Sequence, residues 1–240
     1  MITPVRGVLF DLDDTLFDHN FSTNCATAAL RGCEPALAVW SLEELRLRHS
    51  ELLETIHREV VAGRLSIDDA RRERFRRLLT DAGATDDAEA VGRASAAAIR
   101  YREEYQRSCR AVAGAAELLT ALKNRKLRVA VVTNNLTAEQ EQKIKRCGFG
   151  GRIDALITSE GTGIAKPEIG IFTAALAEIG VSASEAVMVG DAWDTDIAGA
   201  LAAGVRPIWF NWRGHPPRET AVAEIAALTP LDKAVAAICG

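Results

Sequence analysis

Three aspartates stand within four positions, directly after a short apolar run: Asp11, Asp13 and Asp14 follow residues 8–10. The run is long enough for a buried strand. Side chains alternate along an extended chain, so Asp11 and Asp13 would point the same way. Structural needs alone explain such mutually repelling carboxylates poorly. The pair could instead share a hard cation, with one carboxylate acting as a nucleophile.

Further polar residues end other apolar segments of the chain. They are Thr133 and Asn134 after one segment, Gly190 and Asp191 after another, and Lys166 in a loop that follows a fourth. Ligands of open α/β sheets bind beyond the carboxyl ends of the strands. We therefore expect these side chains to meet in one crevice with Asp11 and Asp13.

Phosphoryl transfer is the chemistry that fits this set, because it needs charge neutralisation and oxygens held in line. We predict that Asp11 attacks to form an aspartyl-phosphate, while Asp13 protonates the leaving oxygen and later deprotonates the attacking water. A Mg²⁺ ion would relieve the repulsion between the Asp11 carboxylate and the phosphate. The predicted metal-binding residues are Asp11, Asp13 and Asp191, and the predicted phosphate-binding residues are Thr15, Thr133, Asn134 and Lys166.

The elements that must position these residues alternate between helix and strand from about residue 113 onward. The predicted strands are 128–133, 155–158, 186–189 and 205–211, and the predicted helices are 115–123, 137–147, 168–179, 195–203, 218–228 and 231–238. Thr137 to Gln140 has the form of a capping box for one of these helices. The alternation predicts an α/β fold with a Rossmann-like, doubly wound parallel sheet.

A long insert without strand patterns separates the first strand from the rest of this fold. It predicts helices over 24–37, 42–62, 66–82 and 86–106, which form a small all-helical unit. We place the α/β core at 1–17 and 109–240, and the helical unit at 18–108. Five arginines crowd the third of these helices: Arg71, Arg72, Arg74, Arg76 and Arg77. The acids among them favour a salt-bridged, solvated face over an anion-recognising patch.

Composition and charge exclude several classes of protein. The chain has 240 residues, of which 48% are hydrophobic and 26% charged, and its net charge is −4. These values are typical of a soluble globular protein and give no support to nucleic-acid binding. The five cysteines form no C-x-x-C pair, and no histidines have metal-ligand spacing. With no apolar run long enough for a membrane helix and no secretion signal, we expect a cytoplasmic protein without membrane contacts.

The same four segments resemble, in order, the four motifs of the haloacid dehalogenase (HAD) superfamily of phosphohydrolases. They are Asp11-Leu12-Asp13-Asp14-Thr15, Thr133, Lys166-Pro167 and the segment from Gly190 to Asp196. The resemblance implies the roles given above and adds Asp196 as a supporting acid near the metal or the lysine. Asp194, a nearer neighbour of Asp191, is the alternative for that role. Asn135 stands where many relatives carry glycine.

The position of the insert distinguishes two types of cap in this superfamily. Class C1 members carry a helical cap after the first motif, whereas other members carry an α/β cap between the second and third motifs. The insert lies between Asp11 and Thr133, and only a short segment separates Thr133 from Lys166. The resemblance therefore implies a helical C1 cap that closes over small substrates.

Together, the residues and the resemblance predict a Mg²⁺-dependent phosphatase for small phosphomonoesters: a nucleotide, a sugar phosphate or a small acid phosphate. The overall pattern looks most like the nucleotidase, N-acylneuraminate-9-phosphatase and phosphoglycolate phosphatase branch. One alternative is a β-phosphoglucomutase-like phosphomutase, which shares the motifs and the cap. Another is a 2-haloacid dehalogenase, which works without metal and lacks an acid at the position of Asp13. A third is a non-catalytic binding protein, which the intact acids argue against.

Overall fold

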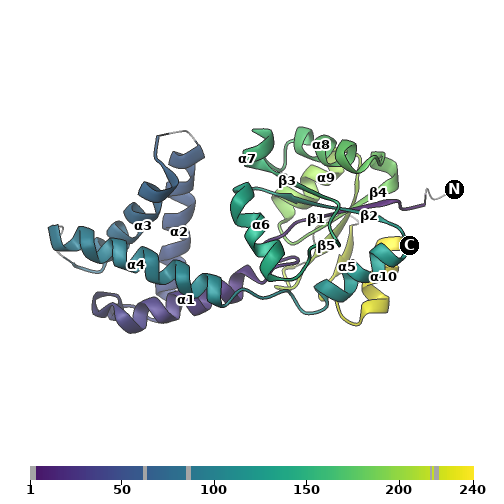
Figure 1. Ribbon diagram of the computed structural model, residues 1–240. Helices are drawn as coiled ribbons and strands as arrows, with labels where there is room; N and C mark the ends of the chain where they lie inside the picture. The colour runs from purple at the N-terminus through teal and green to yellow at the C-terminus, as the bar shows by residue number, and fades with distance from the viewer. Residues whose placement is uncertain (1–3, 62–63, 85–87, 217, 219–221) are drawn as a thin grey trace. The chain divides into compact units, whose positions relative to one another are not determined.

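The strands of the chain form one six-stranded sheet in the order β3-β2-β1-β4-β5-β6, with all neighbours parallel (Figure 1). The structure is a computed structural model that describes residues 4–61, 64–84, 88–216, 218 and 222–240. The strands are β1 (Gly7–Phe10), β2 (Arg128–Thr133), β3 (Ala155–Thr158), β4 (Ala186–Gly190), β5 (Arg206–Phe210) and β6 (Ala223–Ile225). The central strand β1 is buried throughout, as an apolar strand covered on both faces should be.

Helices cover both faces of this sheet, which confirms the predicted doubly wound α/β fold (Figure 1). They are α5 (Ala115–Asn124), α6 (Thr137–Arg146), α7 (Ser159–Thr162), α8 (Ile169–Ile179), α9 (Ala198–Ala202) and α10 (Leu231–Cys239). Helices α5 and α10 pack together on one face, and α8 and α9 on the other. Phe172 and Ile171 of α8 share a buried core with Leu9 of β1 and Met188 of β4.

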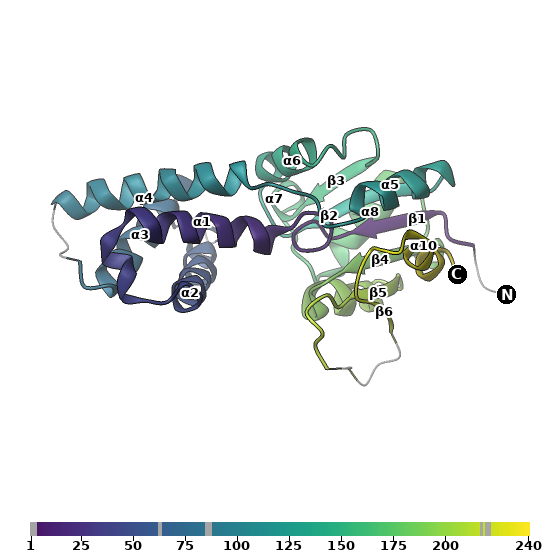
Figure 2. The ribbon, with the colours of Figure 1, turned by 90° about the horizontal axis from the view of Figure 1, so that it is seen from below.

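The described chain divides into two compact units, Met1–His19 with Cys109–Gly240 and Asn20–Ser108. The second unit is helical, as its sequence predicted (Figure 2). Its apolar core includes Leu30, Phe75 and Leu78. Its elements are α1 (His19–Cys33), η1 (Pro35–Val39), α2 (Leu42–Val61), α3 (Ile67–Asp81) and α4 (Ala88–Arg107). Among the described residues, no helix combines the length and apolar character needed to cross a bilayer.

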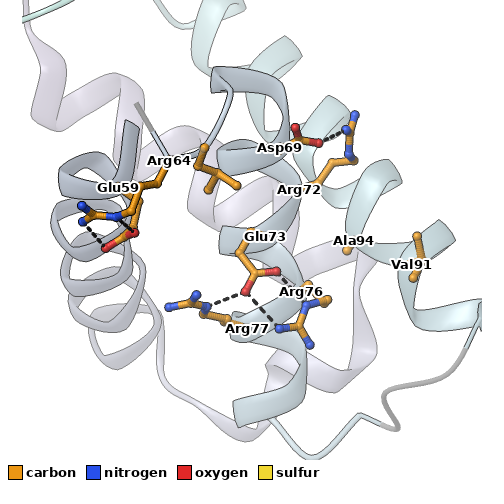
Figure 3. A pocket seen from close by; sticks show the side chains of 10 residues that line it. Glu59, Arg64, Asp69, Arg72, Glu73, Arg76, Arg77, Val91 and Ala94 are labelled. Carbon is orange, nitrogen blue, oxygen red and sulfur yellow. Dashed lines mark hydrogen bonds and ion pairs between the residues drawn. The ribbon is translucent and has the colours of Figure 1, made fainter. Parts of the chain in front are cut away.

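Ion pairs occupy the arginine-rich face of α3, as predicted from the acids among the arginines (Figure 3). Glu73 accepts hydrogen bonds from Arg76 at 2.8 Å and from Arg77 at 2.6 Å. Asp68 pairs with Arg71 and Asp69 pairs with Arg72, in each case three positions further along the same helix. A cavity of about 440 Å³ between α3 and its neighbours is lined in part by the pairs that Asp69 and Glu73 form. Four of the five guanidinium groups, those of Arg71, Arg72, Arg76 and Arg77, therefore already have carboxylate partners.

Two predicted helices differ from the structure. The helix predicted over 24–37 is wrong at both ends. Helix α1 begins at His19, five residues before the predicted start, and it stops at Cys33, because Pro35, which has no N–H to donate, opens the separate turn η1. The predicted helix 218–228 is also wrong where it is described, since residues 223–225 form β6. Residues 219–221 lie outside the described chain. Strand β5 offers its free edge to β6, and this pairing overrides the helical propensity of the alanines.

Candidate active site

The first, second and fourth strands are neighbours in the sheet, so their carboxyl ends bring three predicted residues together. Asp11 follows β1, Thr133 ends β2, and Asp191 follows β4. The backbone N–H of Asp11 donates to the carbonyl of Val189 at 2.9 Å, which ties the turn after β1 to β4. Parallel pairing places all these ends at one edge of the sheet, where ligands bind in open α/β folds.

Three carboxylates form a cluster at this edge. Asp11, Asp191 and Asp196 each have an oxygen that lies within 4.8 Å of the others. Asp11 and Asp196 are buried, and Asp191 is partly buried. Buried carboxylate oxygens at this spacing fit a hard divalent cation. The side chain of Asp13 lies outside this cluster, and Asp196 is the third carboxylate within it.

The turn between β4 and α9 explains how Asp196 reaches the cluster. The π-helical segment η3 (Trp193–Ile197) directs Asp196 inward, where its Oδ2 accepts a hydrogen bond from the backbone N–H of Ala192 at 3.1 Å. A Cβ atom at Gly190 would collide with the Asp196 side chain, so glycine is required there. Asp194 is exposed. Of the two acids considered for the supporting role, the geometry brings only Asp196 to Lys166.

Lys166 is the buried cation of the cluster. Its Nζ lies 2.6 Å from Oδ1 of Asp11 and 2.7 Å from Oδ1 of Asp196. The amide of Asn134 fixes the backbone of Lys166: its Oδ1 accepts from Lys166 N at 2.7 Å, and its Nδ2 donates to Lys166 O at 2.8 Å. Asn134, predicted to bind phosphate, is thus seen to position the lysine.

Burial and charge act in opposite directions on this group of residues. Burial raises the pKa of Asp11 well above its usual value, and the Lys166 ammonium opposes that rise. Burial disfavours the ammonium of Lys166, but the carboxylates of Asp11 and Asp196 more than offset this and raise its pKa. A further cation at the cluster would favour the ionised, nucleophilic form of Asp11.

The carboxylate of Asp13 is held by two side chains of helix α6. Its Oδ1 lies 2.6 Å from Nζ of Lys143, and its Oδ2 accepts from Nε2 of Gln140 at 2.9 Å. His19 Nδ1 lies 3.9 Å from the same carboxylate. Burial alone would raise the pKa of Asp13, but Lys143 and His19 outweigh it and hold this pKa well below its usual value. Asp13 is therefore ionised at rest.

Gln140 and Lys143 are site residues that the sequence did not reveal. The predicted capping box is wrong: Leu136 is the N-cap of α6, and Gln140 is buried, where it donates to Thr133 Oγ1 at 2.7 Å as well as to Asp13. Thr137 Oγ1 lies 2.7 Å from Thr158 Oγ1 instead of capping the helix. The sequence feature that could have indicated them is their spacing, because residues three positions apart in a helix lie on the same face.

The hydroxyl of Thr15 is a further feature of the site. The Thr15 side chain is fully buried, and its Oγ1 has no hydrogen-bond partner within the part of the chain that the structure describes. A buried hydroxyl without a partner is costly unless a ligand satisfies it. This observation fits the predicted phosphate-binding role of Thr15.

Comparison with known proteins identifies the family. A profile of the haloacid dehalogenase-like hydrolases matches residues 5–204 of the chain. The chain therefore belongs to the haloacid dehalogenase-like hydrolases, and the resemblance of its four motifs to this superfamily is confirmed.

Relatives of known activity cover most of the chain. It is 34% identical over 225 residues to the ribulose-1,5-bisphosphate 5-phosphatase of Halopiger xanaduensis, which covers 92% of this chain and 89% of the relative. It is 30% identical to the glyceraldehyde 3-phosphate phosphatase of Methanothermobacter thermautotrophicus, with 86% of each chain covered.

Solved structures share the same fold. A 2-haloacid dehalogenase from Pseudomonas syringae pv. Tomato is 31% identical, has a TM-score of 0.65 and covers 97% of this chain and 98% of its own. The HAD hydrolase YfnB from Bacillus subtilis has a TM-score of 0.74 at 23% identity, with 97% and 99% of the chains covered. The second likeness supports the fold alone.

Proposed function

We propose that this chain is a Mg²⁺-dependent phosphatase that hydrolyses small phosphomonoesters through an aspartyl-phosphate on Asp11. The observation that carries the proposal is the pairing of a buried carboxylate cluster around Lys166 with a second, separately held carboxylate at Asp13. One carboxylate can serve as nucleophile while the other moves protons. The named phosphatases among the relatives support the same class.

In the proposed reaction, an oxygen of Asp11 attacks phosphorus, and the P–O bond to the leaving group breaks. Asp13 gives its proton to the leaving oxygen, then takes a proton from the water that attacks the phosphorus of the aspartyl-phosphate. The bond between phosphorus and the Asp11 oxygen breaks in this second step, which releases inorganic phosphate and restores the Asp11 carboxylate. The negative charge of a bound phosphate raises the pKa of Asp13, which opposes Lys143 and lets Asp13 carry the proton. Lys166 and Thr15 would bind the phosphate oxygens.

Asp11, Asp191 and Asp196 are the residues that would hold the cation. Oxygen donors in a buried, negatively charged cluster match the preference of Mg²⁺. When bound, the ion supplies positive charge that offsets repulsion between the phosphate and the carboxylates.

The proposed substrates are small sugar and triose phosphates, with pyrimidine 5′-nucleotides and phosphoserine as further members of the class. The proposal is supported by the names of the relatives: a ribulose-bisphosphate phosphatase, glyceraldehyde 3-phosphate phosphatases, pyrimidine nucleotidases and a phosphoserine phosphatase. We propose that the helical unit Asn20–Ser108 is the cap that selects among them. We also propose a cytoplasmic location, in keeping with five cysteines that form no disulfide.

Phosphate release from p-nitrophenyl phosphate with MgCl₂ tests the reaction class. Asp11→Asn should abolish release, and Asp13→Asn should slow it by about 10²–10⁴-fold. Acid quenching of Asp13→Asn should trap a hydroxylamine-sensitive phosphoprotein. Asp232→Asn, an exposed change at the start of α10, serves as the control. Release that survives in Asp11→Asn would contradict the proposed nucleophile. Failure to isomerise sugar phosphates would separate the phosphatase from a phosphomutase.

A 2-haloacid dehalogenase is the second candidate, because one solved structure at 31% identity carries that name. A halide leaves without protonation, so displacement of halide has no use for a proton-carrying acid at Asp13. The contacts from Lys143 and Gln140 to Asp13 therefore favour the phosphatase. Chloride release from 2-chloropropionate, insensitive to removal of Mg²⁺, would favour the dehalogenase instead.

A further inference from the structure

Arg213 bridges two carboxylates next to the proposed metal site. Its Nη1 donates to Oδ2 of Asp191, and its Nη2 donates to Oδ2 of Asp14 at 2.7 Å. The side chains of Asp191 and Asp14 are about nine-tenths buried, whereas that of Arg213 is 38% exposed. The guanidinium thus reaches from the surface to two largely buried acids.

The segment after β5 holds Arg213 in this place. The side chain of Asn211 clamps the turn, since its Oδ1 accepts from His215 N at 2.8 Å and its Nδ2 donates to His215 O at 2.9 Å. The guanidinium carbon lies 4.0 Å from the centroid of the Trp212 ring. Fixing the guanidinium in this way reduces the conformational freedom that an ion pair must otherwise lose.

The same segment also fixes the backbone of Asp191. Trp209 Nε1 donates to the Asp191 carbonyl at 2.9 Å. The main chain of Asp191 is therefore held by β5 and its carboxylate by Arg213. The guanidinium engages Oδ2 of this carboxylate, and an oxygen of the same carboxylate lies within 4.8 Å of oxygens of Asp11 and Asp196.

Asp14 has no part in the proposed phosphoryl transfer, yet its backbone is in an uncommon conformation. Its φ of 63° lies in the left-handed region, and the residue is buried. Such a conformation costs free energy in a residue other than glycine and persists where its surroundings demand it. The contact to Arg213 gives the buried Asp14 carboxylate a cationic partner.

We propose that Arg213 is a positioning residue for the metal ligand Asp191, and that Asp14 is the anchor of Arg213. The inference rests on the proposed function, in which Asp191 binds the cation. Hydrogen bonds that orient a ligating carboxylate commonly change metal affinity by 10–100-fold when they are removed. Arg213 therefore raises Mg²⁺ affinity although it is itself a cation.

The test measures the melting temperature of the full chain against MgCl₂ concentration, which reports binding without activity. The midpoint of each variant is taken as the MgCl₂ concentration that produces one fixed rise in melting temperature, because stabilisation by a ligand grows with its concentration without reaching a plateau. This concentration should be about 10–100-fold higher for Arg213→Gln. Arg213→Lys should be intermediate, because an ammonium cannot hold both carboxylates with the fixed fork of arginine. Asp14→Asn should shift the midpoint in the same direction, and adding it to Arg213→Gln should cause little further change.

Arg218→Gln is the matched control, because it removes the same charge from the same segment. The Arg218 guanidinium lies over the Trp193 ring at 5.4 Å. The MgCl₂ midpoint of Arg218→Gln should equal that of the unmodified protein. If Arg213→Gln fails to fold, Asp14→Asn still tests the inference, since it retains the arginine.

An unchanged midpoint in Arg213→Gln or, where that variant does not fold, in Asp14→Asn would overturn the inference. A lower MgCl₂ midpoint would overturn it too, because Arg213 would then compete with the ion instead of orienting its ligand. Asp191→Asn distinguishes a failure of the proposed metal site from a failure of the proposed role of Arg213. If Asp191→Asn binds Mg²⁺ as well as the unmodified protein does, the proposed metal site fails, and the inference fails with it. If Asp191→Asn weakens Mg²⁺ binding but Arg213→Gln leaves the MgCl₂ midpoint unchanged, the inference fails and the proposed function stands.

Discussion

The ammonium of Lys143 lies 2.6 Å from the carboxylate of Asp13, although the two residues are 130 positions apart in the chain. The lysine side chain is buried, with its Nζ also 5.1 Å from the centroid of the Phe17 ring. A proton carrier that starts as an ion pair must be shifted toward its acidic form by the substrate. In the proposed mechanism, Lys143 would thus set how readily Asp13 exchanges its proton.

Replacing Lys143 with methionine should change the pH dependence of turnover. Loss of the ammonium raises the pKa of Asp13, so the group that must accept a proton from water becomes protonated at higher pH. The acid limb of the kcat profile should move to higher pH, with kcat at pH 5 reduced by about tenfold or more. Lys145→Met, on the exposed side of the same helix, is the control. Superimposable profiles for the two variants would refute this role of Lys143.

Lys166→Met should destabilise the fold through the carboxylates that it leaves behind. Removing one partner from a buried ion pair typically costs about 3–5 kcal/mol, and Lys166 has two buried partners. MgCl₂ should restore part of this loss, because a cation at the cluster compensates the same charges. Urea unfolding with and without MgCl₂ measures both effects.

Lys123→Met provides the comparison for this experiment. Lys123 pairs with Asp154 at 2.6 Å in a more exposed position, where ion pairs contribute at most about 1 kcal/mol. Lys123→Met should therefore lower the free energy of unfolding only slightly, and MgCl₂ should not change this difference. Equal destabilisation by the two changes would show that the cluster tolerates the missing cation.

The parallel sheet and the residues at its strand ends could be predicted because both depend on short stretches of sequence. An apolar run followed at once by Asp11, or by Thr133, indicates a buried strand and a polar residue beyond its end. Parallel topology then brings these ends together without any further information. Asp191 was predicted from the same pattern, and Asp196 was implied by the family resemblance.

Residues that depend on how a helix is turned, or on a distant loop, could not be found in this way. Gln140 has the same local pattern whether it caps α6 or faces Thr133, and only packing against the sheet decides between them. Arg213 meets Asp14, a residue 199 positions earlier, through the turn after β5. Strand β6 forms because β5 has a free edge, whereas its Ala223 and Glu224 favour helix in isolation.

Glu73→Gln should remove a pH-dependent part of the stability of the helical unit. Hydrogen bonds from Arg76, with Arg77 adding to them, lower the pKa of Glu73 from 4.5 to about 2. Since the folded pKa is the lower one, this stabilisation is present above pH 4.5 and is lost as the pH falls toward 2. The variant should be less stable by about 1 kcal/mol at pH 7, a value reduced for partial exposure.

Urea unfolding of Glu73→Gln and the unmodified protein at pH 7 and pH 3 checks this expectation. The difference in unfolding free energy should narrow at pH 3, because the Glu73 carboxylate of the unfolded chain, with its higher pKa, takes up a proton before that of the folded protein does. Glu54→Gln, an exposed change on α2, controls for the loss of one negative charge. A difference that grows on acidification would show the opposite linkage.

The five cysteines should differ strongly in reactivity toward alkylating agents. Burial, with Cys109 nearby, raises the pKa of Cys147 to about 12, and only the thiolate reacts. At pH 8 about one Cys147 thiol in ten thousand is ionised, whereas Cys33 is exposed. Iodoacetamide should therefore label Cys33 at least about tenfold faster, as measured by mass spectrometry of peptides. Both should react alike in urea, and equal rates in the folded protein would show that the Cys147 thiol is not shielded as the structure indicates.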